Sequence, residues 1–104
     1  MAWATLFIAG ILEVVWAYYM KLSVGFTKLG ASVITIVAMI ASFSLLSYAM
    51  RSLPLGTAYM IWTGIGAVGS FVVGVVILGE SITPMRIFAA LLIVSGLVTM
   101  KLAS

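Results

Sequence analysis

The sequence has 104 residues, of which 65% are hydrophobic and only 7% are charged, and its formal net charge is +3. Soluble domains are about 45 to 50% apolar and about a quarter charged, so this composition excludes an ordinary water-soluble globule. Cysteine and histidine are both absent from the sequence, which excludes disulfides, thiolate nucleophiles and zinc sites of the usual kind. The basic residues are scattered singly, so nucleic acid is not an expected partner, and we expect neither a cofactor nor a metal.

Four long apolar segments follow one another, and nearly all charged residues lie between them. A spanning helix needs about 20 apolar residues, because the hydrocarbon core is about 30 Å thick. We expect spans at about residues 2–20, 30–50, 55–78 and 84–102, all helical because lipid offers the backbone no hydrogen-bond partners. The fourth run is the shortest, but Thr83 can cap it and Pro84 suits its first turn. The connections are too short for another domain, so residues 1–104 are expected to form a single transmembrane domain.

The positive charges give little preference for either orientation in the membrane. Four spans place Arg51 and Lys101 on one side, and Lys21, Lys28 and Arg86 on the other. Two against three is a weak bias under the positive-inside rule, so both orientations can be inserted. Since four short helices enclose a solute pathway poorly, we expect at least a dimer.

One acidic residue, Glu13, lies near the middle of a predicted span. An ionised carboxylate at that depth is costly and normally faces a partner or a water-filled cavity, which makes it a functional-site hypothesis. The alternative is a permanently protonated glutamate with a structural role. Gly10 and Trp16 lie one helical turn away, and the Trp16 ring can attract a cation by up to about 2 kcal/mol when desolvated. These residues predict a site that binds protons and a small organic cation.

Residues of the second and third spans are candidates to complete this site. Met39 and Ser42 share one face of the second span. The Ser42 hydroxyl could orient the Glu13 carboxylate, or it could only satisfy its own backbone. Tyr59 and Trp62 share a face of the third span and could form an aromatic box, with core packing as the alternative.

Small residues of the last two spans suit helix movement or helix contact. Gly64 and Gly66 lower the cost of bending the third span, although close helix packing explains them equally well. The fourth span contains Ala89, Ser95 and Gly96 and has no ionisable residue at mid-depth. We expect it to contact another helix, as in a dimer.

Several stretches resemble the small multidrug resistance family over essentially the whole chain. They are Glu13-Val14-Val15-Trp16, Lys21-Leu22-Ser23, Gly25-Phe26-Thr27, Pro54-Leu55-Gly56-Thr57-Ala58-Tyr59 and Trp62-Thr63-Gly64-Ile65-Gly66. The resemblance implies an all-α membrane protein with four transmembrane helices per subunit, assembled as an antiparallel dual-topology dimer in the bacterial cytoplasmic membrane. It also implies that this dimer exchanges cations for protons through a shared pair of glutamates.

Within the family, Trp16 and residues 56–66 resemble the guanidinium exporter branch, since the drug-exporting branch typically lacks the first-helix tryptophan. Guanidinium is planar, presents a fork of N–H donors that matches a carboxylate, and stacks on aromatic rings. The resemblance implies the following roles: substrate and proton binding by Glu13, orientation by Trp16 and Ser42, and lining and gating of the pocket by Tyr59 and Trp62. The overall prediction is a proton-coupled guanidinium antiporter.

Bulky residues keep a second function open. Tyr18, Tyr19 and Met60 depart from the guanidinium branch, which favours a polyspecific exporter of quaternary ammonium and other lipophilic cations. The stretch from Ala41 to Met50 also resembles members that work as paired non-identical subunits, although we expect a homodimer.

Three other classes fit the residues less well. A proton-translocating rotor subunit is usually a two-helix hairpin, and a structural or channel-forming protein would show flux without saturation. An enzyme would need a second acid, base, nucleophile or metal ligand at membrane depth, so we expect no enzymatic activity.

Overall fold

The computed structural model describes residues 1–103, which form four helices and no strand. Helix α1 spans Ala2–Leu22, α2 spans Leu29–Ala49, α3 spans Leu55–Val76 and α4 spans Pro84–Leu102. Each helix is long and apolar enough to cross a membrane. The predicted all-α class with four transmembrane helices is confirmed, and the chain is a multi-pass membrane protein, consistent with the bacterial cytoplasmic membrane.

The start of α4 follows the predicted cap. The Arg86 backbone N–H donates a hydrogen bond to Thr83 Oγ1 at 3.1 Å, and Pro84 is the first helical residue. Both features suit the first turn of a helix, where backbone N–H groups have no partner within the helix. The cap fixes where the shortest apolar run becomes helical.

Two helix ends differ slightly from the predicted ranges. Helix α1 continues to Leu22, past the expected end near residue 20, and stops where residues 24–26 adopt positive φ angles between 50° and 70°. Helix α3 ends at Val76, before the expected residue 78, and Gly79 turns the chain with φ of 71°. A positive φ cannot continue a right-handed helix, so these turns set the ends more sharply than the apolar runs do.

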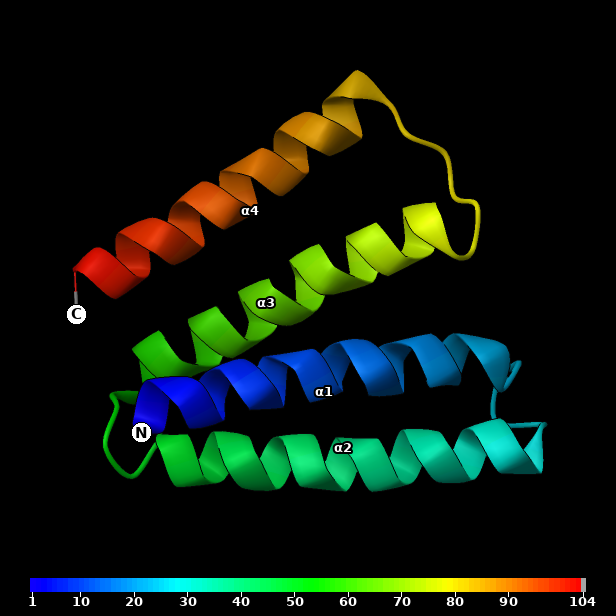
Figure 1. Ribbon diagram of the computed structural model, residues 1–104, viewed down its shortest axis with the longest axis horizontal. Helices are drawn as coiled ribbons and strands as arrows, with labels where there is room; N and C mark the ends of the chain where they lie inside the picture. Colours follow the sequence, from blue (N-terminus) through cyan, green and yellow to red (C-terminus); the bar gives the residue numbers. More distant parts are fainter. Residues whose placement is uncertain (104) are drawn as a thin grey trace.

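The helices lie side by side in a flat layer, in the order α2, α1, α3, α4 (Figure 1). The Cα atoms extend over 40 × 35 × 16 Å, and one helix with its side chains is about 10–12 Å across. Within residues 1–103, the backbone of α4 approaches that of α3 alone. The layer is therefore little more than one helix deep, and both of its faces are open in a single chain.

The core lies where α1, α2 and α3 meet. Its buried residues are Leu6, Ala9, Leu46, Ala49, Ala58, Ile61 and Trp62. Burial recurs every three or four residues along α2, from Ser32 to Ala49, so one face of α2 meets its neighbours. Small residues at such contacts let membrane helices approach closely. Helix α4 contributes no buried residue to this core and packs against it through Leu97 and Met100.

Candidate functional site

Glu13 lies in the middle of α1 and packs against α3. Its side chain is partly buried, and its Oε1 atom is buried without a hydrogen-bond partner among residues 1–103. A methyl group on Gly66 would overlap the carboxylate, so the missing side chain at Gly66 provides the space that Glu13 occupies. Buried polar atoms are normally hydrogen-bonded. The Oε1 atom therefore departs from this rule in the described part of the chain, which singles out Glu13 as the candidate binding group.

Ser42 of α2 connects to both α1 and α3 through hydrogen bonds. Its Oγ donates a hydrogen bond to the Ala9 carbonyl at 2.7 Å and accepts one from Trp62 Nε1 at 3.0 Å. Because an indole N–H can only donate, the single hydroxyl proton goes to Ala9. The two partners considered from the sequence were the Glu13 carboxylate and the backbone of the serine's own helix. In this structure the hydroxyl proton goes to neither of them. Ser42 therefore positions α1 and Trp62.

Four aromatic rings form a row across α1, α2 and α3. The ring centroids are 6.2 Å apart for Trp16 and Phe43, 5.6 Å for Phe43 and Trp62, and 5.6 Å for Trp62 and Tyr59. These separations are typical of interacting aromatic pairs. Trp62 is buried, whereas Phe43 and Tyr59 are about half exposed. The row thus begins at Trp16, one turn from Glu13, and ends at Tyr59, which is half exposed on one face of the layer.

The Trp16 indole adds a second unused polar atom to the site. Its Nε1 is buried and has no hydrogen-bond partner in the described part of the chain. Trp16 lies one helical turn after Glu13, so a donor and an acceptor without protein partners occur one turn apart on α1. The structure therefore links Trp16, Ser42, Tyr59 and Trp62, four of the predicted site residues, through ring contacts and a hydrogen bond among α1, α2 and α3, with Glu13 one turn from Trp16.

Other predicted residues occupy helix contacts. A methyl group on Gly10 would come within 2.6 Å of the Ile65 side chain, and one on Gly64 would overlap Leu97 of α4. Gly10 thus lets α1 and α3 approach closely, and Gly64 does the same for α3 and α4. A role of Gly10 in the substrate pocket stays a prediction. Met39 is partly buried on α2. Helix α3 is continuous through Gly64, so a hinge there stays a prediction.

The predicted dimer residues of α4 are accessible. Ala89, Ser95 and Gly96 are exposed, and an added methyl group on Gly96 would meet nothing within 4 Å. The Ser95 hydroxyl donates to the Leu91 carbonyl of its own helix at 2.8 Å. Helix α4 thus has small, exposed residues at these positions, and their role in a dimer stays a prediction.

Two residues have contacts at the site that the sequence does not predict. Phe43, which links Trp16 to Trp62, was not predicted as a site residue, although an aromatic residue adjacent to Ser42 was the available signal. Gly66, a predicted hinge residue, forms the surface against which Glu13 packs, and its role as a hinge stays a prediction. That contact depends on the register between α1 and α3, which a single sequence does not encode locally.

Four spanning helices with a partly buried carboxylate midway along α1 define a small multi-pass membrane protein with an intramembrane acidic residue. Residues 1–93 match the family model described as Small Multidrug Resistance protein. The chain belongs to the small multidrug resistance family. It is similar to proteins named guanidinium exporter from Citrobacter freundii and Salmonella typhimurium, each 55% identical, and from Escherichia coli K12, 56% identical. Each alignment covers 100% of this chain and 99% of the relative.

Proposed function

We propose that this protein exports guanidinium compounds in exchange for protons, with Glu13 as the shared binding group. The observation that carries the proposal is the Glu13 carboxylate, which is partly buried against Gly66 with an unsatisfied oxygen. A carboxylate and a nearby aromatic ring suit a planar cation that forks its N–H donors and stacks. The relatives named guanidinium exporter support this substrate, and their names describe exporters rather than enzymes.

In the proposed mechanism, the proton and the cation exclude each other at Glu13. The ionised carboxylate binds the cation, and protonation removes the charge that holds it. Each ligand then stabilises the conformation in which it binds best, so the site alternates between the two sides of the membrane. An inward proton gradient would drive the cation outward.

The proposal includes an antiparallel pair of identical subunits that share two Glu13 side chains. One chain is a single layer in which Phe43 and Tyr59 are about half exposed. A second layer against this face would enclose the row of aromatic rings and a solute path. The near balance of positive charges at the two ends supports insertion in both orientations. A pair of non-identical subunits would satisfy the same geometry.

The test is electrical recording from purified protein in liposomes with guanidinium on one side and a proton gradient across the membrane. Glu13→Gln keeps the size of the side chain but cannot ionise, so we expect the coupled current to disappear. Glu80→Gln is the matched control, because Glu80 lies outside the helices and pairs with Arg86 at 3.3 Å. Proton-driven guanidinium flux that survives in Glu13→Gln would contradict the proposal.

A cavity beside the site favours a second candidate, export of quaternary ammonium and other lipophilic cations. Between α3 and α4, Tyr59 and Met60 line a cavity of about 280 Å³ together with Thr63. Met60 is exposed there and offers a flexible, polarizable surface that adapts to bulky substituents. Competition decides between the candidates: a polyspecific protein would lose guanidinium current when tetrapropylammonium is added, whereas a guanidinium-selective one would not.

A further inference from the structure

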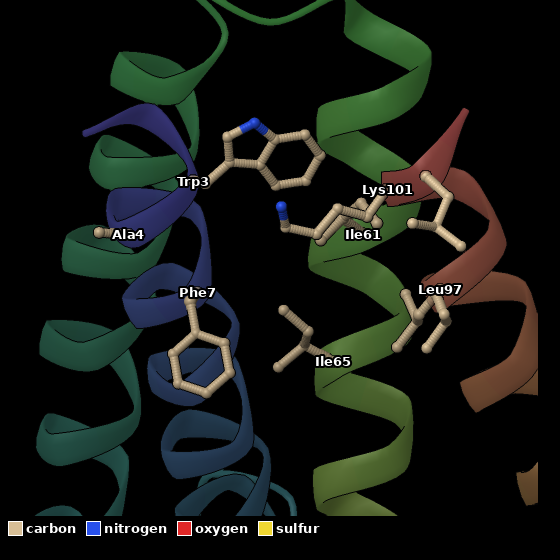
Figure 2. Close-up of a pocket in the computed structure, with 9 residues that line it drawn as sticks. Trp3, Ala4, Phe7, Ile61, Ile65, Leu97 and Lys101 are labelled. Atoms are coloured by element: carbon tan, nitrogen blue, oxygen red, sulfur yellow. The ribbon is translucent and has the colours of Figure 1, made fainter. Parts of the chain in front are cut away.

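A cavity of about 530 Å³ lies between α1, α3 and α4. Phe7 of α1 and Ile65 of α3 face each other across it, and Leu97 of α4 borders the same space (Figure 2). Its lining is apolar apart from one cation, Lys101. No part of the guanidinium mechanism uses this cavity.

The cavity opens on the opposite face of α3 from Tyr59. Ile61 and Ile65 line it, while Thr63 lines the cavity that contains Tyr59. At 3.6 residues per turn, Thr63 points about 200° away from Ile61. A partner subunit that covers the Tyr59 face would leave this cavity open to lipid, a step that rests on the proposed dimer.

Lys101 holds a positive charge at one end of the cavity. Its Nζ lies 4.6 Å from the centroid of the Trp3 ring, and Figure 2 shows the ammonium beside the indole, with Phe7 and Ile65 farther along the cavity. The start of α1 and the end of α4 lie at the same end of the layer (Figure 1), and the side chains of Trp3 and Lys101 meet between them. Tryptophan and lysine typically occupy such helix ends at the level of the lipid headgroups.

We propose that the 530 Å³ cavity, an open groove between α1, α3 and α4, binds an anionic phospholipid. An acyl chain lies along Phe7, Ile65 and Leu97, where it covers apolar surface that one chain leaves open. The lipid phosphate lies against the Lys101 ammonium, which the Trp3 ring holds over the mouth of the groove. Basic groups at the ends of membrane helices attract lipids with a net negative headgroup, so the site selects phosphatidylglycerol over phosphatidylcholine.

The chain offers a matched control for the charge. Arg51 stacks on the Tyr48 ring at 5.7 Å and follows α2, at the same end of the layer as Lys101 (Figure 1). It does not line the 530 Å³ cavity. Both pairs therefore present a cation over an aromatic ring near the same membrane surface. Trp3 and Lys101 line the 530 Å³ cavity, whereas Tyr48 and Arg51 do not.

The first experiment is native mass spectrometry of the full-length protein in detergent with an equimolar mixture of phosphatidylglycerol and phosphatidylcholine. We expect preferential retention of phosphatidylglycerol, a roughly fivefold lower preference in Lys101→Gln, and no change in Arg51→Gln. Ala4→Phe introduces a ring into the groove lining and should lower retention of both lipids. An equal loss in Lys101→Gln and Arg51→Gln, or full retention in Ala4→Phe, would overturn the proposal.

A second experiment identifies what covers the groove in the membrane. A photoreactive phenylalanine at Val98, which lines the groove, should cross-link to lipid, and a cross-link to a second copy of the chain would overturn the proposal. Glu13→Gln separates the two proposals, because it should lose transport and keep its preference for phosphatidylglycerol. A wild-type protein that transports guanidinium but shows no preference for phosphatidylglycerol would refute the lipid site alone.

Discussion

At the scale of single residues, the Ser42 hydroxyl holds three helices in register. It bonds to the Ala9 carbonyl at 2.7 Å and to Trp62 Nε1 at 3.0 Å. We expect Ser42→Ala to lower the free energy of unfolding by about 1–3 kcal/mol, because the buried Trp62 N–H loses its acceptor. Unfolding of the purified protein by titration with a denaturing detergent measures this loss.

The double variant Ser42→Ala with Trp62→Phe tests whether the unpaired donor causes the effect. Phenylalanine removes the N–H, so the combined loss should be smaller than the sum of the two single losses. Additive losses would show that packing, not the hydrogen bond, explains the destabilisation.

Gly66 supports the most direct prediction about the acid. Because a methyl group at this position would overlap the Glu13 carboxylate, we expect Gly66→Ala to displace the acid and reduce guanidinium flux by tenfold or more, on the order of what a misplaced reacting group costs. Gly30→Ala is the control, since its added methyl group meets nothing within 4 Å and Gly30 lies at the start of α2, away from the acid. Flux in liposomes measures both variants. Equal flux in the two would show that Glu13 does not depend on this space.

The residue types of the site were predictable, whereas their contacts were not. Glu13 stands out as an acid in an apolar run, and Trp16, Tyr59 and Trp62 stand out as aromatics at helical spacing. The bond from Ser42 to the Ala9 carbonyl depends on how α2 meets α1, and the overlap of Gly66 with Glu13 depends on how α3 meets α1. Such registers arise from packing between helices, so they carry no local signature in the sequence.

At the scale of helices, α4 depends on its contact with α3. Gly64 receives the Leu97 side chain, and α4 contributes no buried residue of its own. Gly64→Ala should overpack this contact and lower the free energy of unfolding by about 1–3 kcal/mol, and adding Leu97→Ala should recover part of that loss. The melting temperature in detergent checks the effect, and hydrogen exchange of α4 amides locates it. A loss that Leu97→Ala deepens would contradict the contact.

The existence of the four helices follows from the sequence because it depends on the length and apolarity of each segment. Their ends depend on turn residues, which is why α1 reaches Leu22 and α3 stops at Val76. Their order across the layer was not predictable. All four segments are apolar on every side, so hydrophobic periodicity does not mark which face meets which neighbour.

At the scale of the whole molecule, the flat layer exposes the aromatic row on one side and the lipid groove on the other. Phe43 and Tyr59 belong to the first face, and Ile61 and Ile65 line the second. The proposed transport requires the solute to be enclosed away from lipid, which is why the proposed dimer covers the first face. The proposed dimer and the proposed lipid site therefore use opposite faces and do not compete.

The antiparallel dimer can be tested by fixing the orientation of each subunit. Ser81→Lys with Ile82→Lys raises the positive charges on the side of Arg86 to five, against two on the side of Lys101. Ser52→Lys with Ala103→Lys and Lys28→Gln instead leaves two on the side of Arg86, against four on the side of Lys101. Under the positive-inside rule each set should insert in a single, opposite orientation.

Each charge variant alone should lack guanidinium transport, because an antiparallel pair needs both orientations. Co-expression should restore transport, because each variant supplies the orientation that the other lacks. Topology is read from a reporter fused to the end of the chain, and transport from guanidinium efflux in cells. The requirement for two orientations makes mutual rescue the distinguishing result: a parallel dimer or a monomer would give one variant that is active alone, and co-expression would add nothing to it.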